Sequence, residues 1–374
     1  MRIACISASR VPSRAANSIQ VMKVCQALAQ LGHQVCLLVP GNTPIPWDQL
    51  ADHYGLETPF EVEWLPAQAR LKRYDFAWRA VNRAQAQRVD VVYVWPLQAG
   101  VTALLRGLPV LLEMHGEPEG RLGPTLFRFF LRLRGKKRLL PITHALAAHL
   151  ERIYRHTFSP GEVVIGPNGV DLRRYEGLPD LAEARRMLGL PETTTAGYTG
   201  HLYPGRGIGL LVELARRYPH VHFLWVGGRP EDEETWRREL ASQSLANVSL
   251  TGFVPNSRLP LYQAAADILL MPYERAIAGS SGGNSADYCS PMKMFEYMAC
   301  GRAILSSDLP VLREVLNESN AVLCPPEDTE AWDVAFGALL DNSVQRQALG
   351  CRARQDVTAY TWQARACKAL EGFW

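Results

Sequence analysis

The sequence has no long apolar run, and this absence excludes a membrane-spanning helix. Such a helix needs about 20 consecutive apolar residues, and no run in the 374 residues approaches that length. The opening stretch MRIACISASR is too short, and too polar after Ser7, for a secretory signal. We therefore expect a cytoplasmic protein, with peripheral contact on the inner face of the membrane as an open alternative.

Cysteine patterns typical of metal or disulfide proteins are also missing. The eight cysteines form no C-x-x-C pair, and no cysteine and histidine group has zinc spacing. No Asp-x-Asp pair offers a site for a divalent ion. We expect reduced thiols, no metal and no other cofactor.

A strong charge of one sign is absent too. The formal net charge of +3 does not indicate a nucleic-acid partner, and there is no fixed-period repeat or low-complexity tract. The chain is rich in apolar residues instead, with 47% hydrophobic and 21% charged. Its length and composition are sufficient for two domains, each with its own core.

Short apolar runs alternate with longer amphipathic segments along the whole chain. The first half has such runs at 2–7, 35–39, 90–95, 109–114 and 138–143. The second half has them at 195–200, 221–228, 248–252, 267–271, 302–307 and 321–324. Apolar strands separated by helices predict parallel sheets covered on both faces. The expected fold is α/β, with two doubly wound Rossmann-like domains.

A segment rich in Gly, Pro, Asn and Asp at 166–180 is the predicted linker. We predict an N-terminal domain over 1–175 and a C-terminal domain over 176–358. Ligands of such sheets bind outside the carboxyl ends of the strands. A cleft between the two domains is therefore the expected site.

The stretch YTGHLYPGRGIG (198–209) predicts a strand, a glycine-rich loop and a helix. Backbone N–H groups and the helix dipole at such a turn attract phosphate, and Arg206 could add a bidentate contact. An ordinary strand–helix turn with a surface arginine explains the pattern equally well.

The stretch SPMKMFEYMACG (290–301) predicts a short helix after the loop 279–291, with Ser290 as its cap and Pro291 at its first position. Lys293 opposes the helix dipole, so a nearby anion explains it better than helix stability does. Glu296 could pair with Lys293 or accept hydrogen bonds from two ribose hydroxyls. Its apolar neighbours favour the ribose, because a buried carboxylate without partners is costly.

His115 follows the apolar run 109–114 and so stands at the end of a predicted strand. Glu113, two residues earlier, points to the same side of that strand and could orient the ring. A purely structural histidine is the equal alternative.

Segments 165–175, 198–215 and 290–316, in this order, resemble the retaining glycosyltransferases of family four, which have the two-domain GT-B fold. The resemblance covers nearly the whole chain. Residues 2–39 are similar to the family's first strand–loop–helix–strand. The end of the chain, 359–374, is similar to its closing helix, which crosses back onto the first domain.

The resemblance implies transfer of a hexosyl group from a UDP- or GDP-sugar, with retention of configuration and without a metal. The nucleotide sugar would be a co-substrate. By similarity, we assign catalytic roles to His115, Arg206 and Lys293. The donor-binding residues would be Gly200, His201, Phe253, Val254, Cys289, Ser290, Met292 and Glu296.

Two positions depart from the family pattern. His201 stands where many members have an arginine. Tyr288 stands where many members have the first glutamate of an E-x7-E pair whose second acid is Glu296. Asp287, or backbone N–H groups of 289–293, would have to hold the donor sugar instead.

The acceptor would be a glycan, a lipid-linked sugar or a small molecule. Arg10, Arg14 and Asn17 lie in the loop where the family contacts the acceptor, although a solvated loop is an equal interpretation. The segment 121–138 has seven basic residues and no acids, so it could lie on an anionic bilayer. A helix that faces the core with a basic outer side is the alternative.

Two other functions fit the same fold. A nucleotide-sugar epimerase would need additional carboxylates, for which Glu113 and Glu117 are the candidates. A two-lobed sugar-binding protein would need no catalytic groups. A transferase of polysaccharide or glycolipid biosynthesis is the leading hypothesis.

Overall fold

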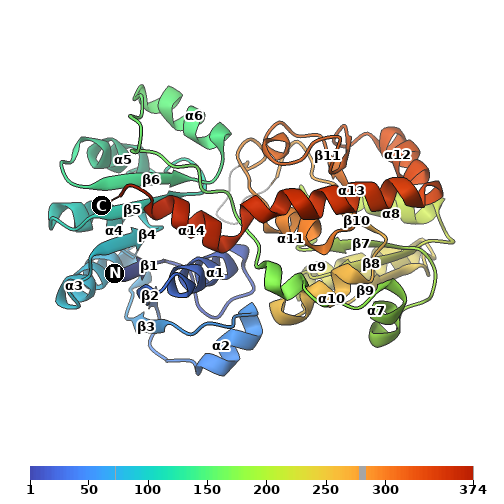
Figure 1. Cartoon of the computed structure of the whole chain (residues 1–374), viewed down its shortest axis with the longest axis horizontal. Helices are drawn as coiled ribbons and strands as arrows, with labels where there is room; N and C mark the ends of the chain where they lie inside the picture. The colour runs from blue at the N-terminus through green and yellow to red at the C-terminus, as the bar shows by residue number, and fades with distance from the viewer. Residues whose placement is uncertain (72, 278–283, 374) are drawn as a thin grey trace. The chain divides into compact units, whose positions relative to one another are not determined.

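Two parallel six-stranded sheets organise the chain, as the computed structural model shows for residues 1–71, 73–277 and 284–373 (Figure 1). The chain forms two units, each with one of the sheets. Unit 1 consists of Met1–Asn168 and Trp362–Trp374, and unit 2 of Gly169–Thr361. The predicted α/β class with two Rossmann-like sheets is confirmed.

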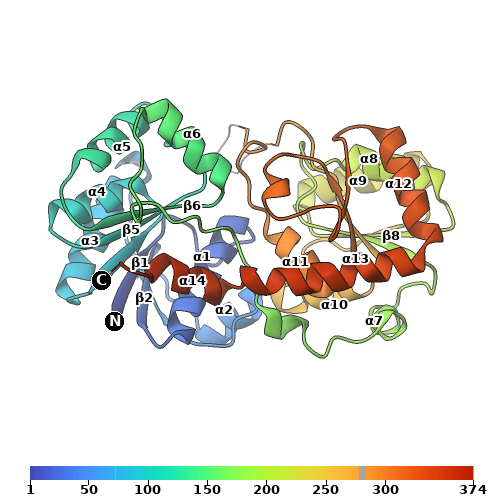
Figure 2. The ribbon, with the colours of Figure 1, turned by 45° about the horizontal axis from the view of Figure 1, so that its top comes forward.

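The sheet of unit 1 has the strand order β3-β2-β1-β4-β5-β6. Its strands are β1 (Arg2–Ile6), β2 (Gln34–Pro40), β3 (Glu61–Leu65), β4 (Val91–Val94), β5 (Val110–Met114) and β6 (Lys137–Pro141). Its helices are α1 (Ala16–Gln30), α2 (Trp47–Tyr54), α3 (Tyr74–Ala86), α4 (Leu97–Leu105), α5 (Gly123–Arg132), α6 (His144–Tyr154) and α14 (Trp362–Leu370), with the short η1 (Ala69–Leu71). Helix α14 lies along α1 (Figures 1 and 2), where Gln363 donates to Gln30 over 2.5 Å.

Unit 2 repeats this arrangement, with the order β12-β11-β10-β7-β8-β9. Its strands are β7 (Thr195–Thr199), β8 (His222–Val226), β9 (Val248–Leu250), β10 (Ile268–Met271), β11 (Ala303–Ser307) and β12 (Val322–Cys324). Its helices are α7 (Leu181–Leu188), α8 (Ile208–Arg217), α9 (Pro230–Ser242), α10 (Leu259–Ala264), α11 (Met292–Cys300), α12 (Thr329–Asp341) and α13 (Ser343–Asp356). Short turns of 3-10 helix are η2 (Leu172–Tyr175), η3 (Asn256–Arg258), η4 (Leu312–Glu314) and η5 (Val357–Tyr360).

The central strands explain why the sequence reads as apolar runs. Every residue of β4 (VVYV) and of β10 (ILLM) is buried, as expected for strands with helices on both faces. In each sheet the strand order reverses once, between β1 and β4 in unit 1 and between β7 and β10 in unit 2. Ligands of such sheets bind at the carboxyl ends of the strands beside this reversal.

Three local predictions were wrong. Strand β3 was missed because its sequence EVEWL alternates at the edge of the sheet and is only half-buried. Helix α11 begins at Met292, so Pro291, with extended backbone (ψ 127°), is its N-cap in place of Ser290. The segment 121–138 is not one helix, because α5 ends at Arg132 and Lys137 already begins β6.

None of the helices within the described ranges combines the length and the apolar character that crossing a bilayer requires.

Candidate functional site

The candidate site of unit 2 lies at the carboxyl ends of β7 and β10. Strand β7 ends at Thr199 and leads through a loop to α8, β10 ends at Met271, and α11 begins at Met292. Strands β7 and β10 are neighbours in a parallel sheet, so their carboxyl ends share one edge. The side chains of Arg206, His201 and Lys293 come together there.

Arg206 is held by two tyrosine rings. The centre of its guanidinium lies 4.9 Å from the ring centroid of Tyr203 and 5.1 Å from that of Tyr273. Its Nη2 donates to the Tyr203 hydroxyl over 2.7 Å, whereas its buried Nε has no hydrogen-bond partner. A buried donor without a partner is costly, so a bound anion would satisfy Arg206.

Lys293 also rests on aromatic rings, in the first turn of α11. Its Nζ lies 3.9 Å from the ring centroid of Tyr198 and 5.5 Å from that of Tyr273. Burial, and then the positive charge of Arg206, lower the pKa of Lys293 well below its usual range. A Cβ atom on Gly200 would stand 2.8 Å from this Nζ, so only glycine lets the ammonium come so close to the loop.

His201 is a neutral side chain among cations. Burial, and then the positive charges of Arg206, Arg229 and Lys293, together lower its pKa to about 4. Its ring stacks on Tyr203, with centroids 5.1 Å apart, and its buried Nδ1 has no partner. The loop therefore presents positive charge and unused polar atoms to one place, which suits a phosphate-bearing ligand.

We predict that His201 makes unit 2 sensitive to acid. Its pKa in the folded protein, about 4, lies below the ordinary 6.5. Between these pH values the unfolded chain binds a proton that the folded chain does not, so stability falls as the pH falls through this window. Urea unfolding of wild type and His201→Gln, repeated across the window, should show the smaller loss in the variant. Parallel losses in both proteins would contradict the prediction.

Glu296 lies on the buried side of α11 and is 9% exposed. Its Oε2 accepts from Nε2 of Gln263 over 3.3 Å, and Oε1 of Gln263 in turn accepts from the Tyr175 hydroxyl over 2.8 Å. The structure thus gives this carboxylate a neutral amide partner from α10. Its role toward ribose hydroxyls stays a prediction.

We expect Glu296→Gln to weaken nucleotide binding without unfolding the protein. The amide keeps the shape of the side chain but replaces one acceptor oxygen by a donor, so one ribose hydrogen bond is lost. A hydrogen bond to a charged group contributes about 1.5–3 kcal/mol, which corresponds to a roughly tenfold or larger loss of affinity. Calorimetric titration with a nucleoside diphosphate checks this. Unchanged affinity with lower stability would support the salt bridge with Lys293 instead.

The other residues predicted to bind the donor follow β9 or stand at the start of α11. Their role in donor binding stays a prediction. Phe253 and Val254 follow β9 and are half-buried, and Val254 packs against the hydrophobic core. Burial raises the pKa of the Cys289 thiol to about 12, and Ser290 is buried. Met292 is the first residue of α11.

Of the two residues at the altered E-x7-E position, Asp287 is exposed and Tyr288 half-buried. Part of the loop before them, 279–283, lies outside the described residues.

In unit 1, His115 directly follows β5, as predicted. Its Nε2 lies 2.7 Å from Oε1 of Glu113, so the expected pairing of the two residues is present. The sequence analysis missed the other partners of this carboxylate, which are Gln20, Tyr93 and Arg365. No local pattern could reveal them, because they come from α1, β4 and α14.

Glu117, the other carboxylate considered for an epimerase, is half exposed and lies 3.2 Å from Nε2 of His149. Glu113 is fully buried and already paired. Neither carboxylate is therefore placed as a free base for proton transfer at a sugar carbon.

The predicted acceptor residues Arg10, Arg14 and Asn17 all have exposed side chains, in the loop after β1 and in the first turn of α1. Exposed side chains are compatible with both interpretations of this loop, so acceptor contact stays a prediction.

The basic residues of 121–138 divide into two groups. Lys137 donates to three backbone carbonyls at the end of α5, and the buried Arg138 donates to the carbonyls of Ala369 and Glu371. These two cations are structural. The other five are exposed, beside the exposed Leu122 and Phe129.

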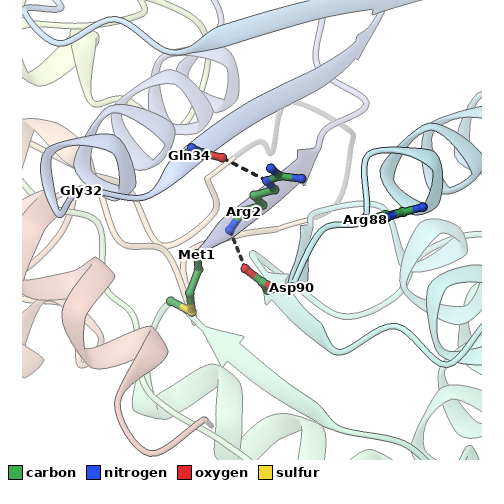
Figure 3. Close-up of a pocket in the computed structure, with 6 residues that line it drawn as sticks. All are labelled: Met1, Arg2, Gly32, Gln34, Arg88 and Asp90. Carbon is green, nitrogen blue, oxygen red and sulfur yellow. Dashed lines mark hydrogen bonds between the residues drawn. The ribbon is translucent and has the colours of Figure 1, made fainter.

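A separate polar hollow of about 380 Å³ lies at the amino ends of β1 and β2 (Figure 3). The backbone N of Arg2 donates to Asp90 over 2.7 Å, and its Nε donates to Gln34 over 3.1 Å. Ligands of parallel sheets bind at the opposite, carboxyl edge. None of the predicted site residues lines this hollow.

Comparison with known proteins assigns the chain to a family. Residues 18–174 match the model described as Glycosyltransferase Family 4, and residues 193–342 match the model described as Glycosyl transferases group 1. The chain belongs to glycosyltransferase family four. The resemblance seen in the sequence is thus confirmed, together with the GT-B fold.

Three similar proteins align with at least 94% of this glycosyltransferase. The phosphatidyl-myo-inositol mannosyltransferase of Mycolicibacterium smegmatis is 25% identical over 94% of this chain and 87% of its own. The sucrose-phosphate synthase of Thermosynechococcus elongatus has a TM-score of 0.74 at 21% identity, covering 98% of this chain and 96% of that one. The Anabaena protein HepE, solved with UDP, has a TM-score of 0.75 at 15% identity and covers 99% of both chains. At such identities the two solved structures show the fold alone.

Proposed function

We propose that this glycosyltransferase moves a hexosyl group from a UDP- or GDP-sugar to a glycan, lipid-linked or small-molecule acceptor, with retention of the anomeric configuration. The observation that carries the proposal is the group of Arg206, Lys293 and neutral His201 at the carboxyl edge of the unit 2 sheet. The complex of HepE with UDP supports a nucleotide-sugar donor.

The proposed chemistry follows from where charge develops. Breaking the bond between the anomeric carbon and the diphosphate oxygen builds negative charge on the leaving group. Tyr198, Tyr203 and Tyr273 fix the side chains of Arg206 and Lys293 before the ligand arrives. Arg206 is already charged, and Lys293 takes up its proton as the diphosphate binds, so both can stabilise the developing charge without moving. These two cations supply the positive charge for which a metal would otherwise be needed.

Retention follows if the acceptor attacks from the face that the diphosphate leaves. The new bond joins the acceptor oxygen to the anomeric carbon, and the acceptor proton passes to the leaving phosphate oxygen. In this scheme Glu296 holds the ribose and His115 contacts the donor sugar.

Among the three acceptor classes, we propose a lipid-linked acceptor. The Mycolicibacterium smegmatis relative is named for a phosphatidylinositol acceptor. In this chain, the exposed bases of 121–136 stand beside exposed Leu122 and Phe129, a combination suited to an anionic bilayer surface. We propose peripheral contact with the membrane there.

The test is incubation of the purified protein with UDP- and GDP-hexoses and a lipid extract, with the product followed by NMR. A glycolipid whose anomeric configuration equals that of the donor would support the proposal. An inverted product would refute retention. An epimerised donor without transfer would favour an epimerase, and a protein that binds free sugar but consumes no donor would favour a binding protein.

Lys293 gives an independent prediction for the same site. Its lowered pKa means that a bound diphosphate, by bringing negative charge, should raise that pKa and cause proton uptake on binding. Titration calorimetry in two buffers of different ionisation enthalpy measures this uptake. At about pH 8.5 the ligand itself does not interfere, because a phosphate has its second pKa near 6. Lys293→Met should abolish the uptake, and equal heats in both buffers for wild type would contradict the prediction.

A further inference from the structure

Glu113, at the end of β5, is the centre of a buried group of side chains in unit 1. Its Oε2 accepts from the Tyr93 hydroxyl over 2.5 Å, and its Oε1 lies 2.8 Å from Nη2 of Arg365. Gln20 donates to the same Oε1, and Nε2 of His115 is 2.7 Å from it. The carboxylate side chain is fully buried, whereas the His115 side chain is 36% exposed.

Arg365 lies on α14, far from Glu113 in the sequence. Backbone carbonyl groups hold its side chain in place. Its Nε donates to the carbonyls of Pro167 over 2.9 Å and Gly166 over 3.2 Å, and its Nη1 lies 2.9 Å from the Tyr93 hydroxyl. The side chain of Arg365 is 4% exposed. Its charge is therefore directed at Glu113 in a fixed position.

The ionisation of Glu113 depends on this arginine. Burial by itself raises the pKa of Glu113, but the charge of Arg365 and then hydrogen bonds from His115 and Tyr93 outweigh it and lower the pKa to about 2. The other titratable group that faces the carboxylate is the Cys25 thiol of α1, whose pKa is raised by burial, so it stays uncharged. Arg365 thus supplies the positive charge that keeps Glu113 ionised.

An ionised carboxylate can only accept hydrogen bonds. Nε2 of His115 must then be the donor to Glu113, which leaves the lone pair of the neutral ring on Nδ1. If the charge of Arg365 were lost, burial would dominate, Glu113 would take up a proton, and the carboxyl group could donate to Nε2. The ring would then carry its proton on Nδ1.

We propose that Arg365 is a positioning residue that acts through Glu113 to fix the protonated nitrogen of His115. The closing helix α14 therefore sets the chemistry of the residue that follows β5 as well as completing the fold. The effect of Arg365 on catalysis rests on the proposed function, in which His115 contacts the donor sugar. Its effect on which nitrogen of His115 carries the proton does not depend on that function.

The direct test is nitrogen NMR of the His115 ring in the protein without ligand, with the signal assigned by His115→Gln. We expect wild type to show the proton on Nε2 when the ring is neutral. Arg365→Lys keeps a positive charge and should keep this tautomer. Arg365→Gln keeps hydrogen-bond donors but removes the charge, so it should shift the proton toward Nδ1 and let Glu113 titrate at higher pH.

Turnover provides the second measurement. A residue that only stabilises the fold would not alter the pH profile of the folded enzyme. We expect kcat of Arg365→Gln to fall by about a hundredfold, with KM for the nucleotide sugar nearly unchanged and a new loss of rate as the pH falls through the raised pKa of Glu113. Arg365→Lys should recover most of kcat and the wild-type pH profile.

Several outcomes would overturn the proposal. A folded Arg365→Gln with the wild-type tautomer and pH profile would make Arg365 merely structural. A wild-type His115 ring with its proton on Nδ1 would also refute the proposal. This measurement needs no variant, so the proposal can be tested even if Arg365→Gln does not fold. If the tautomers behave as expected but no sugar is transferred, the proposed function fails and this inference stands.

Discussion

Arg206→Ala should lower kcat by about 10²–10³, the usual cost of removing one fixed donor that stabilises charge in a transition state. The guanidinium is half-buried between Tyr203 and Tyr273, and its buried Nε has no protein partner. We therefore propose that Arg206 serves a ligand anion and not the fold. Steady-state kinetics with the donor found in the transfer assay measures the effect.

Arg238→Ala is the matched control for this prediction. Arg238 is 72% exposed on α9 of the same unit and pairs with Glu234, so its loss should change kcat by less than about twofold, in line with a surface substitution. If both variants lose activity equally, or if Arg206→Ala retains wild-type turnover, Arg206 does not stabilise the leaving group.

Glu113→Ala should destabilise unit 1 by about 3–5 kcal/mol, the effect of breaking a buried ion pair by removing one partner. The fully buried carboxylate neutralises Arg365, whose side chain is 4% exposed. Without it the guanidinium would stay charged and buried and would have lost its counterion. Urea unfolding followed by a signal from unit 1 provides the measurement.

Glu117→Ala serves as the control, because Glu117 is 49% exposed and its partner is His149. A change of no more than about 0.5 kcal/mol is expected for it. Equal stabilities of Glu113→Ala and Glu117→Ala would show that the buried network adds nothing to the fold.

Much of the fold could be read from the sequence because its strands are buried on both faces. Runs such as VVYV of β4 and ILLM of β10 are continuous and apolar, which is typical of strands covered on both faces. Strand β3 escaped notice because an edge strand with only partial burial keeps polar residues, as EVEWL does.

The candidate site was only partly predictable. Arg206 and Lys293 stand beside glycine-rich or helix-start patterns, which gave them a local signal. The aromatic support from Tyr198 and Tyr273, and the link between Arg365 and Glu113, join distant parts of the chain. Such contacts follow from how strands and helices pack, and a single sequence does not record that packing.

Binding of a nucleoside diphosphate at Arg206 and Lys293 of unit 2 can be measured before the acceptor is known. Thermal unfolding of wild type and Arg206→Ala would be recorded with UDP, GDP, ADP and TDP, each with and without magnesium. A ligand that binds the folded state alone raises the melting temperature. We expect a rise with UDP or GDP in wild type that does not need magnesium and is lost in Arg206→Ala. No rise with any diphosphate, or an equal rise in the variant, would contradict it.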